Sequence, residues 1–187
     1  MDHTGALIAI ARRTAWFMDY LRAARELRLQ SWCVGAGAVR TLVWDALHGV
    51  QNADALPDID LAYFDAFDLR PERDAELARA LGPRWEAVNQ AAVHRWYPAG
   101  AESGLVAVAP LASLAEAIAT WPEYATCVGI WLDWNDKLHV IAPHGLDDLF
   151  GMVIRHNPAR ATAEMYRARV AQKRYAERWP KVQIITT

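Results

Sequence analysis

The alternation of residues 58–63 constrains the fold of this chain more than any other feature. Apolar residues alternate there with polar or small ones, in the order Asp58-Ile59-Asp60-Leu61-Ala62-Tyr63. Successive side chains of a strand point to opposite faces of a sheet, so this period of two predicts a strand with one buried face. Ile59 then points into the core, and Asp58 and Asp60 share the opposite face. The chain must therefore build a sheet with two neighbouring carboxylates on one side.

Helical and strand patterns alternate along the rest of the chain. Apolar residues at spacings of three, four and seven predict one amphipathic helix over residues 5–29. The other expected elements are a strand at 32–34, a helix ending at Gly49, a helix opened by Pro71, a long strand over 85–97, a helix capped by Ser113, a hairpin over 127–141, a short helix over 143–150 and a helix over 159–178. This order favours an α+β fold, a mixed β-sheet flanked by helices.

Length and composition indicate one ordered domain. The chain has 187 residues, of which 53% are hydrophobic and 22% charged, and this excludes a disordered or fibrous protein. We expect a single domain over residues 1–187, with an N-terminal helix in 1–29 and a basic C-terminal helix and tail in 159–187. No apolar stretch approaches the roughly 18 residues that span a bilayer, so we expect a cytoplasmic protein without a membrane partner.

Charge is unevenly distributed along the chain. Residues 45–76 hold nine acidic residues against two arginines, whereas residues 155–187 hold eight basic residues against two glutamates. One interpretation is a division between metal binding and phosphate binding; the alternative is two solvated faces of opposite sign. Arg160, Arg167, Arg174 and Arg178 fall on one face of the predicted last helix, where they can form a basic wall for an anion or a solvated surface.

A glycine turn precedes the acidic strand. Gly35-Ala36-Gly37 lies between a short strand and a helix start, where glycine allows close backbone approach and free N–H groups can bind phosphate. Arg40, one helical turn later, can reach the same anion. The alternative is a plain tight turn. A dinucleotide-binding fingerprint lacks its third glycine, and a P-loop lacks Gly-Lys-Ser/Thr.

The paired carboxylates suit a divalent cation. Asp58 and Asp60 repel each other when they share a face, and a cation with hard oxygen ligands removes that cost. Mg²⁺ also keeps coordination positions open for phosphates. The alternative is a pair of solvent-facing polar residues.

The order of elements resembles the DNA polymerase β-like nucleotidyltransferase superfamily. This order is a strand, a glycine turn, a helix and then a strand that carries Asp-x-Asp. The chain is similar over residues 30–180 to a bacterial family of nucleotidyltransferase-like proteins. The stretches that carry the likeness are Trp32-Cys33-Val34-Gly35-Ala36-Gly37-Ala38-Val39-Arg40, Asp58-Ile59-Asp60-Leu61-Ala62-Tyr63-Phe64-Asp65, Asn89-Gln90-Ala91-Ala92-Val93-His94, Ala119-Thr120-Trp121-Pro122 and Ala142-Pro143-His144-Gly145-Leu146-Asp147-Asp148-Leu149-Phe150. The resemblance implies a nucleotidyltransferase-type sheet.

The resemblance also implies an activity and a site. The activity is transfer of a nucleotidyl group from a nucleoside triphosphate to an acceptor, which can be a small molecule, a protein or RNA. Asp58 and Asp60 would hold Mg²⁺ or Mn²⁺ as catalytic ligands. Gly35 and Gly37 would contact the nucleotide phosphates, and Arg40 is a further candidate for binding the nucleotide.

A third carboxylate decides between two functions. The superfamily places it on a following strand as metal ligand or base, and Glu86 is the only acid on the strand predicted there. If Glu86 faces the two aspartates, the site has the groups for catalysis. The alternative is a catalytically degenerate nucleotide- or nucleic-acid-binding module of the same fold. Trp121 and Trp134 lie at predicted turns, where one of them could stack on a base.

Overall fold

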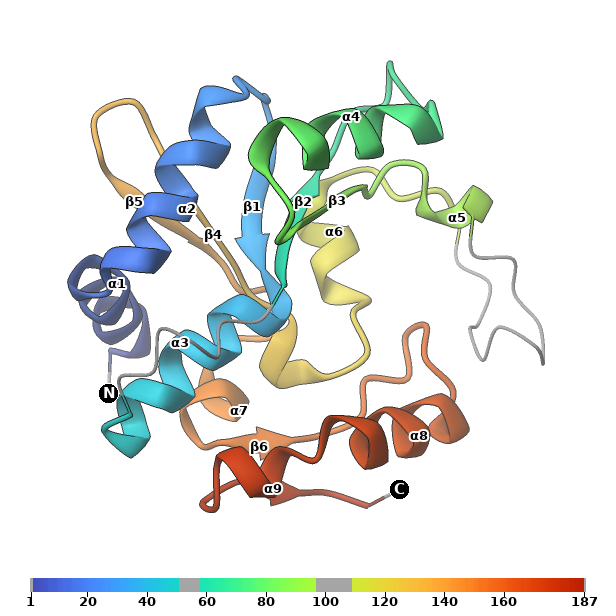
Figure 1. The fold of residues 1–187 in the computed structure, drawn as a ribbon. Coiled ribbons are helices and arrows are strands. Elements are labelled where there is room, and N and C mark those ends of the chain that lie inside the picture. The colour runs from blue at the N-terminus through green and yellow to red at the C-terminus, as the bar shows by residue number, and fades with distance from the viewer. Residues whose placement is uncertain (1, 51–57, 97–108, 187) are drawn as a thin grey trace.

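A five-stranded mixed sheet forms the centre of the molecule (Figure 1). The computed structural model describes residues 2–50, 58–96 and 109–186. The strand order is β3-β2-β1-β4-β5, with β1 antiparallel to both β2 and β4, β4 antiparallel to β5, and β2 parallel to β3. The strands are β1 (Trp32–Gly35), β2 (Ile59–Tyr63), β3 (Trp85–Asn89), β4 (Gly129–Leu132) and β5 (Leu138–Ile141). The α+β fold with a mixed sheet is confirmed.

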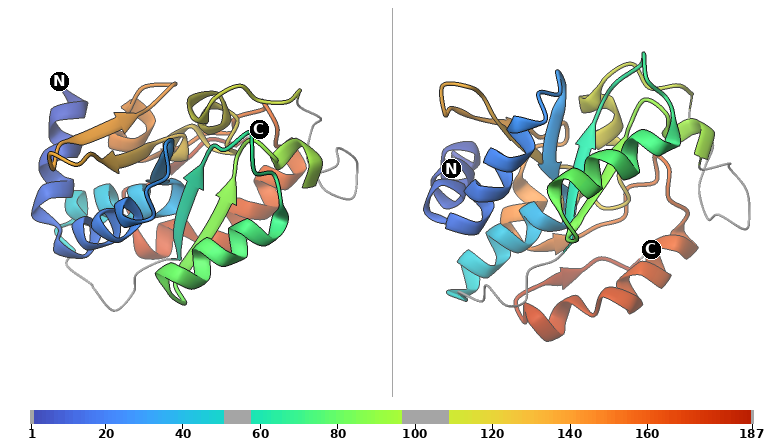
Figure 2. Two further views of the ribbon diagram at one scale, coloured as in Figure 1. Left: turned by 90° about the horizontal axis from the view of Figure 1, so that it is seen from above. Right: turned by 45° about the horizontal axis from the view of Figure 1, so that its top comes forward.

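Helices cover both faces of this sheet, as the view from above shows (Figure 2). The helices are α1 (His3–Arg13), α2 (Ala15–Glu26), α3 (Ala36–His48), α4 (Pro71–Leu81), α5 (Val93–Trp96), α6 (Leu114–Ala119), the 3₁₀ turn η2 (Tyr124–Thr126), α7 (Asp147–Phe150), α8 (Ala163–Lys173) and α9 (Tyr175–Arg178). A small parallel pair, β6 (Val153–Ile154) and β7 (Gln183–Ile184), joins the C-terminal segment. None of these described helices is long and apolar enough to cross a membrane.

The two faces of the sheet have cores of different size. Ile59, Leu61 and Tyr63 of β2 are buried in the large core that includes residues of α1 to α4. Ala62 and Cys33 point the other way, into a small cluster with Leu114 and Ile118 of α6. Alternate side chains of β2 therefore point into two different layers, as predicted. Asp60 lies on the face that α6 covers only in part.

Several element ends follow local signals in the sequence. Gly49 ends α3 in the left-handed region at φ 66°, which suits a residue without a β-carbon. Pro71 starts α4 at its first turn. The Ser113 side chain accepts from the Glu116 N–H at 3.1 Å, and the Glu116 carboxylate accepts from the Ala112 N–H at 2.8 Å. These predictions are confirmed.

The single helix predicted over residues 5–29 is wrong, because the chain breaks at Thr14. Thr14 has extended backbone angles, φ −99° and ψ 99°, and separates α1 from α2. Its hydroxyl donates to the Ile10 carbonyl at 2.9 Å, which uses an acceptor at the end of α1. The break lets both apolar faces reach the core, with Leu7 on α1 and Leu21 on α2 fully buried.

The long strand predicted over 85–97 is also wrong, since β3 ends at Asn89 and α5 follows (Figure 1). The buried Asn89 side chain accepts from the Ala91 N–H at 3.1 Å, and this turns the chain away from the sheet. It also donates to the carbonyls of Asp65 and Asp68, at 2.8 Å each, in the loop after β2. Residue 97, the end of that prediction, lies outside the described residues.

The last helix predicted over 159–178 is two helices that start later. Thr162 caps α8 by accepting from the Met165 N–H at 3.2 Å, and Arg174 interrupts the helix in the left-handed region at φ 47°. Arg160 precedes α8, and Arg178 lies beyond the break. The continuous arginine face expected for this helix therefore does not form.

Candidate functional site

A cavity of about 290 Å³ opens on the α6 side of the sheet, where β2 and β3 face the C-terminal segment. Its lining comes from elements that are far apart in the sequence. The residues are Ala36, Asp60, Leu61, Ala62, Glu86, Val88, Gln90, Val93, Thr120, Trp121, Pro122, Thr126, Arg160, Met165 and Arg169. Among the described residues of this wall, two are acidic and two are arginines, so the cavity has both an anionic and a cationic side.

Asp60 and Glu86 lie next to each other on the anionic side. They are direct partners in the parallel register of β2 and β3, and registered residues of neighbouring strands point to the same face. Asp60 is half-buried and Glu86 is exposed. Burial, followed by the negative charge of Glu86, raises the pKa of Asp60 to about 6. The structure thus brings the expected third acid beside one of the two aspartates.

Asp58 occupies a different environment from Asp60. It precedes β2 and is exposed, although it lies only two residues before Asp60. Within residues 2–50, 58–96 and 109–186, no group of three acidic, histidine or cysteine side chains is arranged to hold a metal ion. The geometry therefore pairs Asp60 with Glu86 more closely than the sequence motif pairs it with Asp58.

The two glycines of the turn have different surroundings. A β-carbon at Gly35 would lie 2.7 Å from the Trp121 ring, so Gly35 is needed for that close packing. A β-carbon at Gly37 would find its nearest neighbours at 3.7 and 3.8 Å, which is ordinary contact. The Gly37 N–H hydrogen-bonds the Asp60 carboxylate. Ala36, between them, has the left-handed φ of 48° and lines the cavity.

Arg40 is buried beneath the cavity and does not line it. Its guanidinium lies 3.9 Å from the Glu123 carboxylate and over the rings of Trp44, Tyr175 and Trp179, at 4.8 to 5.6 Å from their centroids. Burial lowers its pKa, and Tyr175 and Glu123 oppose that shift. Its predicted role as a nucleotide ligand remains a prediction, and its contacts point to a role in the support of the site.

The cationic side of the cavity comes from Arg160 and Arg169. Both were expected among the basic residues of the last helix, but only Arg160 belonged to the predicted arginine face. Arg169 of α8 lines the same cavity as residues of β2 and β3. The sequence carries no local signal for this placement. It is accompanied by a contact with Glu123, which lies 46 positions before Arg169.

An apolar part of the cavity wall includes Trp121, Pro122 and Met165. The buried Asn157 side chain donates to the Trp121 carbonyl at 2.9 Å and so fixes the chain there. The Trp121 indole N–H donates to the side-chain oxygen Oε1 of Gln90 at 3.4 Å. Trp134, the other tryptophan expected at a turn, is 60% exposed and lies away from the cavity, on the β4–β5 hairpin.

A larger hollow of about 640 Å³, lined by residues of α1 to α3, lacks this chemistry. Asp45 is the one acid in its described lining, and it already has partners. It accepts from Arg178 at 2.8 Å and from the Trp179 indole at 2.7 Å. The smaller cavity is therefore the candidate site, because it has the paired acids that the described lining of the larger hollow lacks.

The sequence profile of a family described as nucleotidyltransferase matches residues 22–184, and the chain belongs to this family. A comparison with curated proteins finds no significant match.

Two solved structures are similar to this chain. An NMR structure described as revealing a CCA-adding enzyme head domain has a TM-score of 0.81 at 27% identity, and covers 97% of this chain and 95% of its own. A tRNA-processing enzyme in an apo form has a TM-score of 0.43 at 18% identity, with 89% of this chain and 44% of that chain covered. The first likeness extends over nearly the whole of both chains.

Proposed function

We propose that this chain is a divalent-metal-dependent nucleotidyltransferase, which moves a nucleotidyl group from a nucleoside triphosphate to an acceptor. One observation carries the proposal: Asp60 and Glu86 are registered partners on parallel strands at the wall of a cavity whose other side holds arginines. Carboxylates and arginines facing each other across one cavity suit a metal–triphosphate ligand, which carries both kinds of charge.

The chemistry of the carboxylate pair fits a metal ion. The raised pKa of Asp60 comes from burial and from the negative charge of Glu86. The two carboxylates therefore repel each other in the absence of a cation. Asp60 and Glu86 would hold Mg²⁺ or Mn²⁺, with the neighbouring Asp58 as a further candidate. When bound, such an ion neutralises charge on the phosphates and on the oxygens that attack and leave.

The chain's own residues have separate tasks in this scheme. The Gly37 N–H orients the Asp60 carboxylate. Glu86, the more exposed acid, can accept the proton of an acceptor hydroxyl, which is typically worth about 10²- to 10⁴-fold in rate. Trp121 and Met165 give a nucleobase an apolar surface. The cavity would in this way contact both the phosphates and the base of a nucleotide.

The acceptor can be a small molecule, a protein or RNA. The likeness to a CCA-adding enzyme head domain makes an RNA 3′ end the first acceptor to test. An assay would incubate the protein with each α-labelled triphosphate, Mg²⁺ or Mn²⁺, and RNA, protein or small-molecule acceptors. We expect label transfer to at least one acceptor that requires the metal.

Asp60→Asn and Glu86→Gln are the decisive variants in this assay, and both should lose transfer. Asp148→Asn is a suitable control, because Asp148 pairs with Arg155 outside the cavity. Transfer that continues at the wild-type rate in both site variants would contradict the proposal.

A second candidate function is nucleotide or nucleic-acid binding without turnover. It is favoured by the observation that, within the described lining, only Asp60 and Glu86 are acidic, while Asp58 is exposed and outside β2. In that case the wild-type protein should bind labelled triphosphate but transfer none of it to any acceptor.

A further inference from the structure

A fully buried carboxylate lies under the cationic side of the cavity. Glu123 is 0% exposed, and three groups from different elements surround its carboxylate. Arg169 Nε of α8 donates to Glu123 Oε1 at 2.9 Å, and the Tyr175 hydroxyl of α9 donates to the same oxygen at 2.8 Å. Arg40 Nη1 of α3 lies 3.9 Å from Glu123 Oε2. A buried carboxylate needs such partners, so this cluster has one favoured arrangement.

Arg169 connects this cluster to the cavity. Its side chain is 29% exposed and forms part of the cavity wall, whereas Glu123 and Arg40 do not reach it. The bond to Glu123 uses Nε, and among the described residues no hydrogen bond uses the two Nη groups. Arg169 and Asp60 are also close enough for each to shift the pKa of the other. The guanidinium therefore faces the side of the cavity where the carboxylates lie.

The charge of Arg169 is not cancelled by its partner. Glu123 shares its single negative charge between Arg169 and Arg40, so the cluster has one more positive charge than negative. Arg40 is only 5% exposed and lies over three aromatic rings, so it cannot present that charge to a ligand. An anion in the cavity can then bind the Nη groups of Arg169 while Arg40 keeps Glu123 neutralised.

We propose that Arg169 binds the phosphates of the substrate, and that Glu123 is the positioning residue that holds the Arg169 guanidinium in the cavity. The inference rests on the proposed function in that the anion is a polyphosphate, but it concerns residues that the Asp-x-Asp motif does not contain. It also gives the C-terminal helices a role in the site, because Arg169 and Tyr175 both come from them.

Inorganic triphosphate with Mg²⁺ is the probe, since it lacks the base and the sugar. Its affinity for the full-length protein is measured by calorimetric titration. A charge-assisted hydrogen bond is worth enough that Arg169→Gln should weaken binding about 10- to 100-fold. Arg169→Lys keeps the charge but loses the Nε bond, so its triphosphate affinity should lie between those of the wild type and Arg169→Gln. Arg167→Gln, on the exposed side of the same helix, is the matched control and should bind as the wild type does.

A double-mutant cycle tests the positioning role of Glu123. Glu123→Gln should weaken triphosphate binding by about 5- to 20-fold in the wild type, and by less than twofold in the Arg169→Gln background. Equal losses in both backgrounds would mean that Glu123 acts on the fold and not through Arg169, and would overturn the positioning role. If Glu123→Gln does not fold, Tyr175→Phe, which removes one bond to the same oxygen, takes its place in the cycle.

The outcomes separate this inference from the proposed function. A wild-type protein that transfers nucleotides, together with an Arg169→Gln variant of unchanged triphosphate affinity, overturns the inference alone. A wild-type protein that binds triphosphate through Arg169 but transfers no nucleotide overturns the proposed function alone. Failure of the wild type to bind inorganic triphosphate at millimolar concentration also overturns the inference.

Discussion

Acidic residues at the two sides of the same sheet have opposite surroundings. At the β4–β5 hairpin, Asp133 accepts from the backbone N–H groups of Asn135 and Lys137 at 2.9 and 2.8 Å, and its other oxygen lies 2.9 Å from His139 Nε2. The bond to His139, and then the bond to Lys137, lower the pKa of Asp133. In the cavity, burial and Glu86 raise the pKa of Asp60.

This difference separates an acid with partners in the fold from the acid that we propose to act in the site. Asp133 is stabilised by partners within the hairpin, so its charge helps the chain to fold. Asp60 is next to another acid and is destabilised as an anion, an arrangement that proteins keep where a ligand supplies the missing charge. The comparison predicts that only the change at Asp60 will reduce activity, and that changes at the two aspartates will have opposite effects on stability at pH 8.

The largest expected effect is on activity. Asp60→Asn should reduce nucleotidyl transfer by at least about 100-fold, because a neutral amide cannot replace a carboxylate that neutralises and holds a metal. Asp133→Asn should leave the transfer rate within about twofold of the wild type. Initial rates with saturating Mg²⁺ check both variants. An equal loss in the two variants would remove the distinction between the two sides of the sheet.

The two glycines of the turn should differ in stability. Gly35→Ala brings a β-carbon within 2.7 Å of Trp121 and 3.0 Å of the Val128 carbonyl, and such overpacking typically costs about 1–3 kcal/mol. Gly37→Ala meets only ordinary contacts and should keep its melting temperature within about 2 °C. Thermal unfolding followed by circular dichroism measures both.

Gly37→Val then tests the binding surface, since a larger side chain is placed beside Asp60. The free energy of nucleotide binding that this variant loses should exceed the free energy of unfolding that it loses. A variant that loses stability but binds nucleotide normally once folded would favour the plain turn.

The tryptophans of the two regions offer a smaller contrast. Trp121→Leu should weaken nucleotide binding by about 5- to 50-fold, if a base stacks on the indole at the cavity wall. Trp134→Leu, at the exposed hairpin, should leave nucleotide affinity unchanged. Titrations with a nucleoside triphosphate and with inorganic triphosphate test this together, because only the first ligand has a base to lose. A loss for both ligands would show that Trp121 shapes the cavity and does not contact the base.

The smallest effect is on the stability of the metal-free protein, and its sign depends on pH. Because the pKa of Asp60 is raised to about 6, its contribution to stability is present below about pH 4 and is lost as the pH rises through 6. Asp60→Asn should therefore melt about 2–6 °C above the wild type at pH 8, by roughly half as much at pH 5, and close to the wild type near pH 3.

Asp133→Asn should show the reverse sign in the same experiment. A lowered pKa means that the contribution of Asp133 is present above about pH 4 and is lost as the pH falls through the folded-state value. This variant should melt below the wild type at both pH 8 and pH 5. Melting curves in the presence of a chelator check both aspartates, and a lower melting temperature for Asp60→Asn at pH 8 would contradict the comparison.

Local signals in the sequence were enough for many elements. The alternation around Ile59 predicted β2, Gly49 predicted the end of α3, and the pattern over residues 127–141 predicted the hairpin of β4 and β5. Each of these depends on residues within a few positions of one another, through side-chain period, left-handed backbone or turn geometry. The Asp-x-Asp strand and the glycine turn were recognisable for the same reason.

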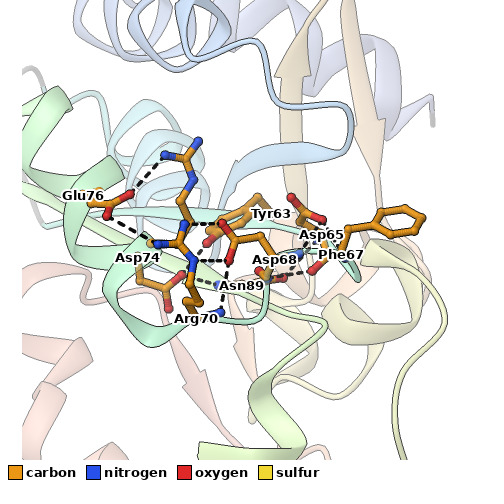
Figure 3. Close-up of polar contacts among 9 residues, drawn as sticks. Tyr63, Asp65, Phe67, Asp68, Arg70, Asp74, Glu76 and Asn89 are labelled. Atoms are coloured by element: carbon orange, nitrogen blue, oxygen red, sulfur yellow. Dashed lines mark hydrogen bonds and ion pairs between the residues drawn. The ribbon is translucent and has the colours of Figure 1, made fainter.

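The errors lie where a distant contact changes a local preference. The apolar period of residues 5–29 continues through Thr14, yet packing of both halves on the sheet divides the helix there. The strand pattern continues past Asn89, but the Asn89 side chain binds the loop after β2 and ends β3 (Figure 3). A periodicity within one segment carries no information on such partners.

The sequence by itself determined which chemical groups the site has available: a carboxylate pair, a glycine turn and a set of arginines. Only the tertiary structure decided which of them meet. Asp60 faces Glu86 because β2 and β3 pair in parallel register, and Arg169, not Arg40, reaches the cavity because α8 packs against Glu123. The physical reason is that side-chain period and turn chemistry act over a few residues, whereas strand register and burial depend on segments far apart in the chain.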